Sequence, residues 1–375
     1  MNMATSKTKV RFCFADGLRG IAATWVVLFH FHAGGHLSNL DQLLPGFLTT
    51  VLFEWGYLGV PIFFVLSGFV IAHSMRKIRV TCSYFQNFSL RRIIRISPPY
   101  YFSIVFVLLF EFLSAKATSE LFEFPSISSL MAHLFYLHDI FRFEPISDIY
   151  WTLCLEMQFY IVFCVLLGLS QWMEEKLQLA YSRHIVFGIS LLIGALWPLN
   201  VFPDILLPGL FLSTWHGFAI GVFAYWAWQQ KGYYRHMFYT YAGLLLISSL
   251  SADVSETTVF LPAATITCVI TSVLLLEIGR ADLMESTLNW QWLQFLGLIS
   301  YSLYLFHNKI SGVAFFFGYK ILGQTLVTEM VGLVAIFGLC VACAAGAYWL
   351  LEKPSIYWSR QVKRVSVGSE KAVGT

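Results

Sequence analysis

The chain has 375 residues, of which 58% are hydrophobic, 17% aromatic and only 12% charged, with a net charge of +3 and a mean hydropathy of +0.69. Charged residues make up about a quarter of an ordinary soluble domain, so the composition excludes that class. Apolar runs recur along the whole length and indicate a helical protein that crosses a membrane many times. Nucleic acid is not expected as a partner.

An all-α bundle of ten transmembrane helices is the predicted fold, because windows of about 20 apolar residues recur along the chain. Two longer loops, 76–97 and 115–149, flank the third span. One membrane domain is expected over residues 12–358, between a cytoplasmic N-terminal segment, 1–11, and a polar cytoplasmic tail, 359–375, with no second folded domain. The predicted spans are residues 16–36, 51–75, 98–114, 150–170, 184–199, 209–229, 237–251, 258–278, 296–318 and 329–351.

Basic residues predict the orientation of these spans. With a cytoplasmic N-terminus, the outer segments hold only Lys116, Arg142 and Lys320, whereas the inner segments hold nineteen lysines and arginines. Positive charge accumulates on the cytoplasmic side, so both ends are predicted to be cytoplasmic, and a bacterial inner membrane is the expected location. The nineteen are Lys7, Lys9, Arg11, Arg76, Lys77, Arg79, Arg91, Arg92, Arg95, Lys176, Arg183, Lys231, Arg235, Arg280, Lys353, Arg360, Lys363, Arg364 and Lys371.

The first span carries three polar residues, Asp16, Arg19 and His30, which also argue against a cleaved signal peptide. Arg19 and His30 are eleven residues apart, so at about 100° per residue they lie on one face, about 16 Å apart along the axis. Asp16 lies within about 40° of that face. Such groups are costly in a membrane and point to a reaction or a pathway. Hydrogen bonding between helices is the structural alternative.

The second span and the loop after it offer contacts for an elongated ligand. Ser67 and the glycine that follows it allow close approach of a backbone or of a slender ligand. Arg91, Arg92 and Arg95 precede Pro98, which is predicted to mark the start of the third span. Three arginines at this boundary suit bidentate binding of phosphates. Contact with anionic lipids explains such a cluster equally well.

Glu156 in the fourth span matches His30 in predicted depth. Each residue lies about 9 Å below the outer end of its helix. A carboxylate that accepts from the imidazole would orient the ring and raise its basicity. The sequence therefore predicts a His30–Glu156 pair in a cavity open to the outer side, with a purely structural partner for Glu156 as the alternative.

Further histidines lie on the ninth span and in the long outer loop. Ser300, Tyr304 and His307 share one stripe of the ninth span near the middle of the bilayer. Structural hydrogen bonding explains His307 as well as a chemical role does. His133 and His138 belong to loop 115–149, where contact with an acceptor is conceivable but not predicted.

No metal site or disulfide framework is expected. His32 and His36 are spaced at i and i+4 but have no evident third ligand, so we expect them to line the outer mouth. The seven cysteines are odd in number and lie mostly in apolar segments. Cys340 and Cys343 match C-x-x-C, but inside an apolar helix they are expected to pack.

Taken together, these motifs resemble the acyltransferase 3 family of integral-membrane acyltransferases, over about residues 12–356. Thr152 stands where the family commonly has serine, and the chain is expected to resemble the stand-alone members, without an extracytoplasmic SGNH-type domain. The motifs are Asp16-Gly-Leu-Arg19-Gly with His30, Phe63-Phe-Val-Leu-Ser67-Gly-Phe69, Arg92-x-x-Arg95 leading to Pro98-x-Tyr100, Trp151-Thr-Leu-x-x-Glu156-x-x-Phe159-Tyr160, Ser300-Tyr-Ser-Leu-Tyr-Leu-x-His307 and Glu352-Lys-Pro354.

The resemblance implies ten core helices with cytoplasmic ends and transfer of an acyl group, usually acetyl from cytoplasmic acetyl-CoA, to hydroxyls of extracytoplasmic glycans, or in some members of antibiotics or lipids. It also implies that Arg19 contacts the donor and that His30 is catalytic. The expected catalytic residues are thus His30 and Glu156. The expected donor-binding residues are Arg19, Ser67, Arg91, Arg92, Arg95, Ser302 and His307.

The predicted function is that of a membrane O-acyltransferase with acetyl-CoA as donor and a glycan or glycolipid as acceptor, surrounded by membrane lipids. A separate extracytoplasmic partner protein is one way to deliver the acyl group. The alternative is a transporter or flippase of a glycolipid or small acid that uses the buried ions as a proton relay. A structural membrane subunit is a third reading, but it leaves the register of Arg19 and His30 unexplained.

Overall fold

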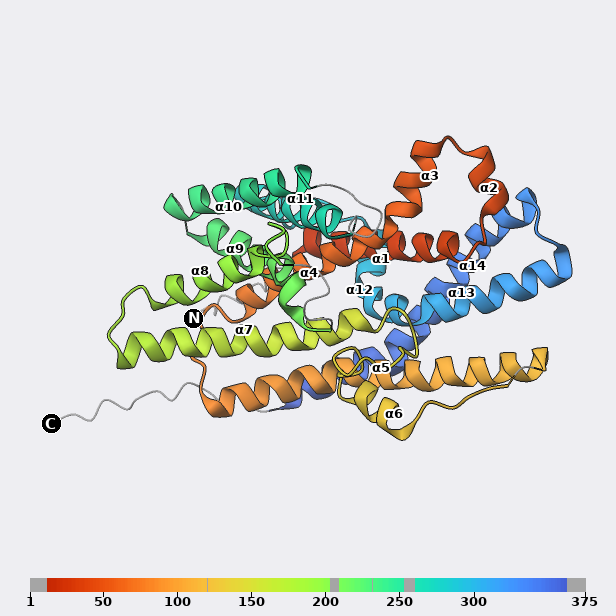
Figure 1. The fold of residues 1–375 in the computed structure, drawn as a ribbon, viewed down its shortest axis with the longest axis horizontal. Coiled ribbons are helices and arrows are strands. Elements are labelled where there is room, and N and C mark those ends of the chain that lie inside the picture. Colours follow the sequence, from red (N-terminus) through yellow and green to blue (C-terminus); the bar gives the residue numbers. More distant parts are fainter. Residues whose placement is uncertain (1–11, 120, 203–208, 231, 253–259, 363–375) are drawn as a thin grey trace, which may run out of the picture.

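The computed structural model describes residues 12–119, 121–202, 209–230, 232–252 and 260–362, which form helices joined by turns, with no strand within these ranges (Figure 1). The predicted all-α class is confirmed. The helices are α1 Cys13–Ala33, α2 Ser38–Leu43, α3 Gly46–Leu52, α4 Gly59–Ser74, α5 Cys82–Thr118, α6 Ile127–Leu134, α7 Trp151–Lys176, α8 Ser182–Ala195, α9 Trp215–Gln229, α10 Tyr233–Leu250, α11 Phe260–Arg280, α12 Gln291–Leu298, α13 Ser300–Leu322, α14 Leu326–Ala347 and α15 Lys353–Gln361. Short turns of helix complete the list: η1 Glu54–Leu58, η3 Phe211–Thr214 and the π-helix η4 Tyr348–Glu352.

Five helical stretches of the described chain are long and apolar enough to cross a membrane: Gly46–Ser74, Cys82–Ala117, Trp151–Lys176, Leu261–Arg280 and Leu326–Gln361. Each of the ten predicted spans overlaps a described helix, but within the described residues only these five stretches are both long and apolar enough to cross a membrane, and residues 258 and 259 of the eighth span lie outside the described residues. The predicted segment 1–11 lies outside the described residues. So does most of the predicted tail 359–375, although α15 continues three residues into it.

The predicted loop 76–97 is largely helical, and the helix that carries the predicted third span begins at Cys82, well before Pro98. Helix α5 runs without a break through Pro98 and Pro99. Each proline removes a backbone donor from the helix, but packing against neighbouring helices keeps the segment in place. Tyr301 on α13, for example, donates a hydrogen bond of 2.7 Å to the carbonyl oxygen of Ile96. The arginines of this segment are therefore carried on a helix that α13 holds in place at Ile96.

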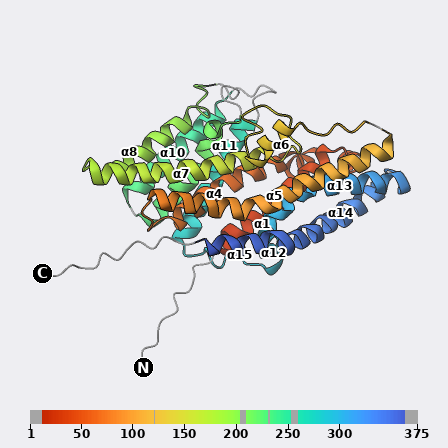
Figure 2. The same ribbon diagram turned by 90° about the horizontal axis from the view of Figure 1, so that it is seen from below.

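Helix α1 lies inside the bundle and contacts η1, α4, α12 and α13 (Figures 1 and 2). Glycines bring the neighbouring backbones close to it. A Cβ at Gly297 would lie 2.0 Å from the carbonyl oxygen of Asp16, and one at Gly56 would lie 2.2 Å from that of Trp25. Only glycine leaves room for this approach. The polar residues of α1 are thus held in place by α12 at one end and by η1 nearer the other.

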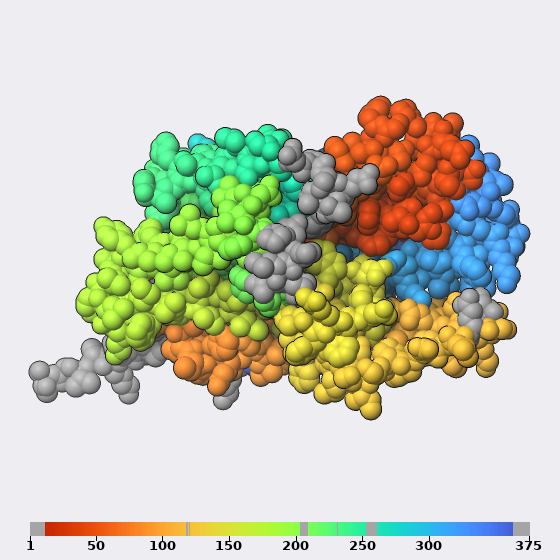
Figure 3. All heavy atoms as spheres, in the orientation of Figure 1, coloured from red at the N-terminus to blue at the C-terminus, as the bar shows by residue number. Residues whose placement is uncertain are grey.

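A buried carboxylate fastens the α2–α3 segment to the end of α14. Glu329 accepts hydrogen bonds from the backbone N–H groups of Asn39 (3.1 Å) and Leu40 (2.8 Å) and from the hydroxyl of Ser38 (3.4 Å). These donors would otherwise be unsatisfied at the first turn of α2. Figure 3 shows the result, with the red α2–α3 segment seated against the blue C-terminal helices.

His133 and His138 belong to the segment between α5 and α7 and are buried there. They are therefore not exposed to an acceptor molecule at the surface. Their rings stack with centroids 4.1 Å apart and an interplanar angle of 3°. His133 Nδ1 donates to the carbonyl oxygen of Ser129 (2.8 Å), and its Nε2 accepts from the N–H of Ile146 (3.1 Å). His138 Nδ1 lies 3.4 Å from the sulfur of Cys154. The pair therefore acts as packing between α6 and α7.

Helices α4 and α9 are in close backbone contact. A Cβ at Gly68 would lie 2.0 Å from the carbonyl oxygen of Phe218, and one at Gly221 would lie 2.1 Å from that of Val65. We predict that Gly68→Ala forces these backbones apart and lowers the free energy of unfolding by about 1–3 kcal/mol. The measurement is the melting temperature of the purified chain in detergent. Gly243→Ala is the control.

At Gly243 a Cβ would meet no heavy atom within 4 Å in the described part of the chain. This control should therefore be neutral or gain about 0.5–1 kcal/mol from the lower backbone entropy of alanine. Equal melting temperatures for Gly68→Ala and the wild type would mean that α4 and α9 are not in backbone contact.

The His133–His138 stack predicts a dependence of stability on pH. Burial lowers the pKa of His138 from 6.5 to about 4, and the pKa of His133 is also lowered by burial. Between about pH 7 and 4 these two histidines therefore bind more protons in the unfolded chain than in the folded chain. The free energy of unfolding falls as the pH drops through this range. His138→Gln should flatten this fall in melting temperature. His236→Gln, at an exposed histidine, should retain it, and equal slopes for the two variants would contradict the assignment.

Candidate active site

A cavity of about 680 Å³ opens between α1, α4, α5, α7, α12, α13 and η4. Three of its lining residues are arginines, Arg19, Arg92 and Arg95, and they come from helices that are far apart in the sequence. Ser67 and Glu156 line it too. The structure thus brings together a set of predicted residues that only spacing and resemblance had connected. A pocket of this volume accommodates an elongated ligand of several hundred daltons.

The arginines differ in their surroundings. Arg19 pairs with Asp16 at 3.3 Å, and both side chains are partly exposed to the cavity. The guanidinium of Arg92 lies over the ring of Tyr160, 4.1 Å from its centroid. Arg91 is directed elsewhere: it lies over the ring of Tyr84 at 5.5 Å and does not line the cavity. On an ideal helix Arg91 lies about 40° from Arg95 and Arg92 about 60° from it, so helix periodicity alone does not separate them. The contact of Arg91 with Tyr84 is what directs its side chain away from the cavity.

Glu156 is bound by hydroxyl groups. Its Oε1 accepts from Ser67 on α4 at 3.0 Å and from Tyr160, one turn along α7, at 2.5 Å. Among the residues that the structure describes, Glu156 and His30 form no hydrogen bond with each other, so the predicted pairing is wrong. The prediction rested on matched depth, and depth does not fix the direction in which a helix points its side chain.

The partner of His30 is His307. His307 Nδ1 lies 3.0 Å and 2.8 Å from the carbonyl oxygens of Leu303 and Tyr304, which can only accept, so this nitrogen carries the proton. His307 Nε2 is then an acceptor, and it lies 3.2 Å from His30 Nδ1. His30 Nδ1 also lies 2.8 Å from the carbonyl oxygen of Val26.

These partners assign the tautomer of His30. Its Nδ1 carries the proton and donates to Val26 and His307, so in the neutral ring Nε2 keeps its lone pair. Within the described ranges, no protein group forms a hydrogen bond with Nε2. The arrangement therefore presents one basic nitrogen of an oriented, half-buried imidazole. The sequence predicted His307 as a donor-binding residue. The carbonyl oxygens of Leu303 and Tyr304 orient its ring instead, and a sequence motif does not reveal such backbone contacts.

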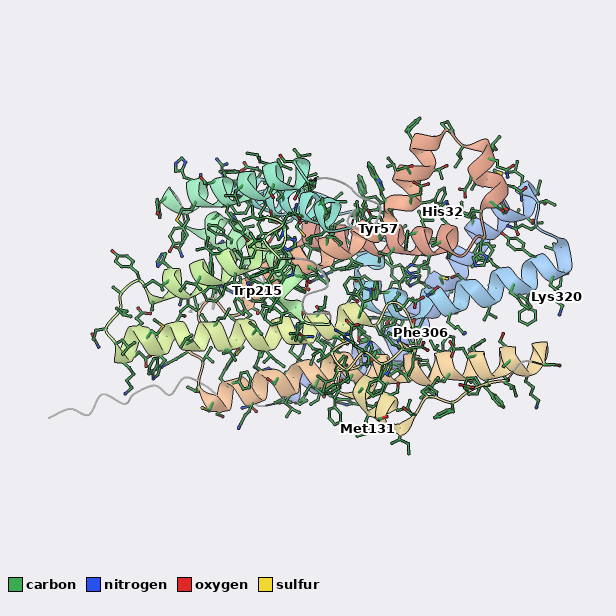
Figure 4. All side chains as sticks on the ribbon, in the orientation of Figure 1. His32, Tyr57, Met131, Trp215, Phe306 and Lys320 are labelled. Atoms are coloured by element: carbon green, nitrogen blue, oxygen red, sulfur yellow. The ribbon has the colours of Figure 1, made fainter. Side chains whose placement is uncertain are left out.

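The remaining walls around His30 are aromatic. Gly56 presses η1 onto α1, which places the ring of Tyr57 5.8 Å from that of Phe29, and Phe29 meets the His30 ring edge-on at 5.1 Å. Figure 4 labels Tyr57, from η1, and His32, which belongs to α1.

Ser302 does not face the cavity. It is fully buried and donates a hydrogen bond of 2.7 Å to Glu352, which does line the cavity. Glu352 closes the π-helix η4, and such widened turns occur often at functional sites. The predicted contact between Ser302 and a donor is therefore replaced by a contact with Glu352.

The two outer histidines are separated. His32 Nε2 pairs with Asp41 at 3.0 Å, whereas His36 stacks on Phe315 with centroids 4.4 Å apart. No group of three or more metal-binding side chains occurs in the part of the chain that the structure describes. His32 and His36 thus each hold the α1–α2 turn through a different contact.

A family profile described as an acyltransferase domain matches residues 14–351. A candidate peptidoglycan O-acetyltransferase of Bacillus subtilis is 24% identical over 346 residues, which cover 79% of this chain and 48% of the relative. The peptidoglycan O-acetyltransferase OatA of Listeria monocytogenes is 28% identical over 200 residues, which cover 48% of this chain and 28% of the relative.

A candidate acetyltransferase of Acidianus two-tailed virus is 25% identical over 337 residues, and the match covers 87% of both proteins. The chain spans about half the length of the Bacillus relative and less than a third of that of the Listeria relative. No solved structure matches the chain.

Proposed function

Because the chain belongs to the acyltransferase family whose profile matches residues 14–351, we propose that it transfers an acetyl group from cytoplasmic acetyl-CoA to a hydroxyl of a glycan outside the membrane. The observation that carries the proposal is His30, an imidazole with an assigned tautomer and a free Nε2, next to a cavity lined by three arginines. The names of the two peptidoglycan relatives support a polysaccharide as acceptor.

The cavity fits the proposed donor in size and charge. A guanidinium group can donate two parallel hydrogen bonds to the oxygens of one phosphate. Arg92 and Arg95 on α5 and Arg19 on α1 therefore suit the nucleotide phosphates of the donor. The pantetheine arm then runs along the apolar wall formed by Phe63 and Phe64. Site volumes of about 300–1,000 Å³ are typical of small-molecule and cofactor pockets. The thioester thereby comes towards the end of the cavity next to α13.

The chemistry follows from the free nitrogen of His30. Nε2 takes the proton of the acceptor hydroxyl while the hydroxyl oxygen attacks the thioester carbon. The new C–O bond forms, the C–S bond breaks, and the coenzyme A thiolate receives the proton from the imidazolium. His307 Nε2 accepts a hydrogen bond from the Nδ1–H of His30 throughout. The same nitrogen can also carry the acyl group in a two-step route.

The proposal includes the orientation that the basic residues predict. Ten membrane helices, two cytoplasmic ends and a bacterial inner membrane place the arginine-lined part of the cavity on the cytoplasmic side. His30 then faces the outer side. A separate extracytoplasmic protein that presents the glycan or receives the acetyl group is compatible with this arrangement.

The first test is replacement of His30 in the purified chain, with acetyl-CoA as donor and a soluble pentamer of N-acetylglucosamine as acceptor. We expect His30→Ala to lower the rate of coenzyme A release at least about 100-fold, because general bases contribute about 10²–10⁴-fold. His307→Gln retains an acceptor oxygen for the Nδ1 proton and should be milder than His307→Leu. His32→Gln is the control.

The control changes a histidine two positions away that pairs with Asp41 instead, so its rate should match that of the wild type. If His30→Ala retains more than about a tenth of the wild-type rate while it remains folded, His30 is not the base.

The second test asks which arginines bind the nucleotide part of the donor. Arg92→Ala and Arg95→Ala should each weaken acetyl-CoA binding about 10- to 150-fold, because each removes a charge-assisted phosphate contact worth about 1.5–3 kcal/mol. The loss should shrink with acetyl-pantetheine, which has no nucleotide. Arg91→Ala, on the same helix but outside the cavity lining, should change donor affinity less. Equal losses for both donors would reassign the arginines to lipid contact.

A further inference from the structure

The donor cavity ends before it reaches His30. Of the described residues that line the cavity, Tyr304 belongs to α13, whereas His307, one turn further along the same helix, does not line it, and neither does His30. The rings follow one another in order. The Tyr304 ring is 6.1 Å from that of His307, and the His307 ring is 4.8 Å from that of His30. Tyr304 therefore stands between the cavity and the imidazole pair.

Tyr304 is fixed at this position by hydrogen bonds to α7. Its hydroxyl lies 2.9 Å from Oγ1 of Thr152 and 3.2 Å from the carbonyl oxygen of Ile149. Thr152 in turn donates to the same carbonyl at 3.0 Å. On the opposite side, the ring of Phe63 from α4 meets the Tyr304 ring edge-on at 6.2 Å. The four groups in contact here are all uncharged, and the side chains of Tyr304 and Thr152 are buried. The four are the Tyr304 ring, the Thr152 hydroxyl, the Ile149 carbonyl and the Phe63 ring.

We propose that Tyr304, Thr152 and Phe63 form an acyl gate that admits only a short acyl group from the donor cavity to His30. This inference rests on the proposed function, and it extends that function to the size of the group transferred. Reacting atoms must approach to about 3–3.5 Å for transfer. The thioester carbon must therefore advance past Tyr304, with the acyl chain ahead of it or beside it.

The gate selects by size because its walls are closely packed rings. An acetyl group adds one methyl beyond the thioester carbon, whereas a butyryl group must displace Tyr304 or Phe63 by two further methylenes. Well-packed interiors resist such insertion. A single methylene in a pocket changes specificity by about 10- to 200-fold. The closed gate also keeps water from the outer side away from a donor that waits in the cavity.

The test compares acetyl-, propionyl- and butyryl-CoA as donors to the N-acetylglucosamine pentamer, with the purified full-length chain. For the wild type we expect kcat/KM to fall about 10- to 200-fold for each added methylene. Phe63→Ala opens one wall of the gate and should raise the butyryl-to-acetyl ratio at least about tenfold. Phe63→Leu, a smaller change in the core, should raise it in the same direction and serves if the alanine variant does not fold.

A second readout concerns the hydroxyl of Tyr304. Tyr304→Phe keeps the ring but removes its hydrogen bonds to Thr152 and Ile149, so hydrolysis of acetyl-CoA without acceptor should rise several-fold. Tyr301→Phe is the matched control. Tyr301 lines the same cavity from the same helix, but its hydroxyl bonds the carbonyl oxygen of Ile96. Whatever its overall rate, this variant should keep the wild-type preference for acyl length and the wild-type share of hydrolysis.

The outcomes separate the two proposals. If the wild type transfers acetyl and butyryl equally well, or if the folded Phe63 variants keep the wild-type ratio while His30→Ala abolishes transfer, the gate is wrong and the proposed function stands. If the wild type transfers no acyl group from any donor, the proposed function is wrong and the gate falls with it. A raised butyryl-to-acetyl ratio in the Phe63 variants alone, with the Tyr301 control unchanged, supports both.

Discussion

A histidine inside an apolar helix bundle can act as a base only if one ring nitrogen keeps its lone pair and the other is held, and in this protein backbone carbonyls set that condition. Val26 fixes the Nδ1 proton of His30 from within α1. Leu303 and Tyr304 fix that of His307 from within α13, which turns His307 Nε2 into an acceptor for His30. Because each carbonyl belongs to the same helix as its histidine, each helix sets the tautomer of its own ring, and the packing of α1 against α13 brings the two rings together.

That packing depends on close backbone contacts, which in turn require glycine. Gly297 on α12 and Gly56 on η1 meet carbonyl oxygens of α1 at distances that exclude any larger residue. A side chain at either place would shift α1 relative to α13 and would open the distance between the two imidazoles. The geometry of the two imidazoles therefore depends on the same glycine contacts that pack the bundle. This explains why a half-buried imidazole persists in so apolar a chain.

The sequence predicted the all-α class and the residues of the cavity lining better than it predicted their contacts. Arg19, Arg92 and Arg95 line one cavity, and the sequence predicted all three as donor-binding residues. The pairing of Glu156 with His30 failed because depth along a helix says nothing of azimuth, and the hydroxyl groups of Ser67 and Tyr160 satisfy the carboxylate instead. The helix that carries the predicted third span begins at Cys82 and not at Pro98, because tertiary packing outweighs the local effect of the prolines.

The carboxylates show how the bundle keeps ionisable groups that an apolar medium disfavours. Glu156 and Glu352 each accept from a hydroxyl, and Glu329 accepts from backbone N–H groups at the start of α2. Arg19 and Arg92, by contrast, are held by a single exposed ion pair and by an aromatic face. The anionic side of the site is therefore satisfied within the protein, while the cationic side retains donors for an external anion. Such an asymmetry suits a cavity that binds phosphates from one side of the membrane and releases only the acyl group towards the other.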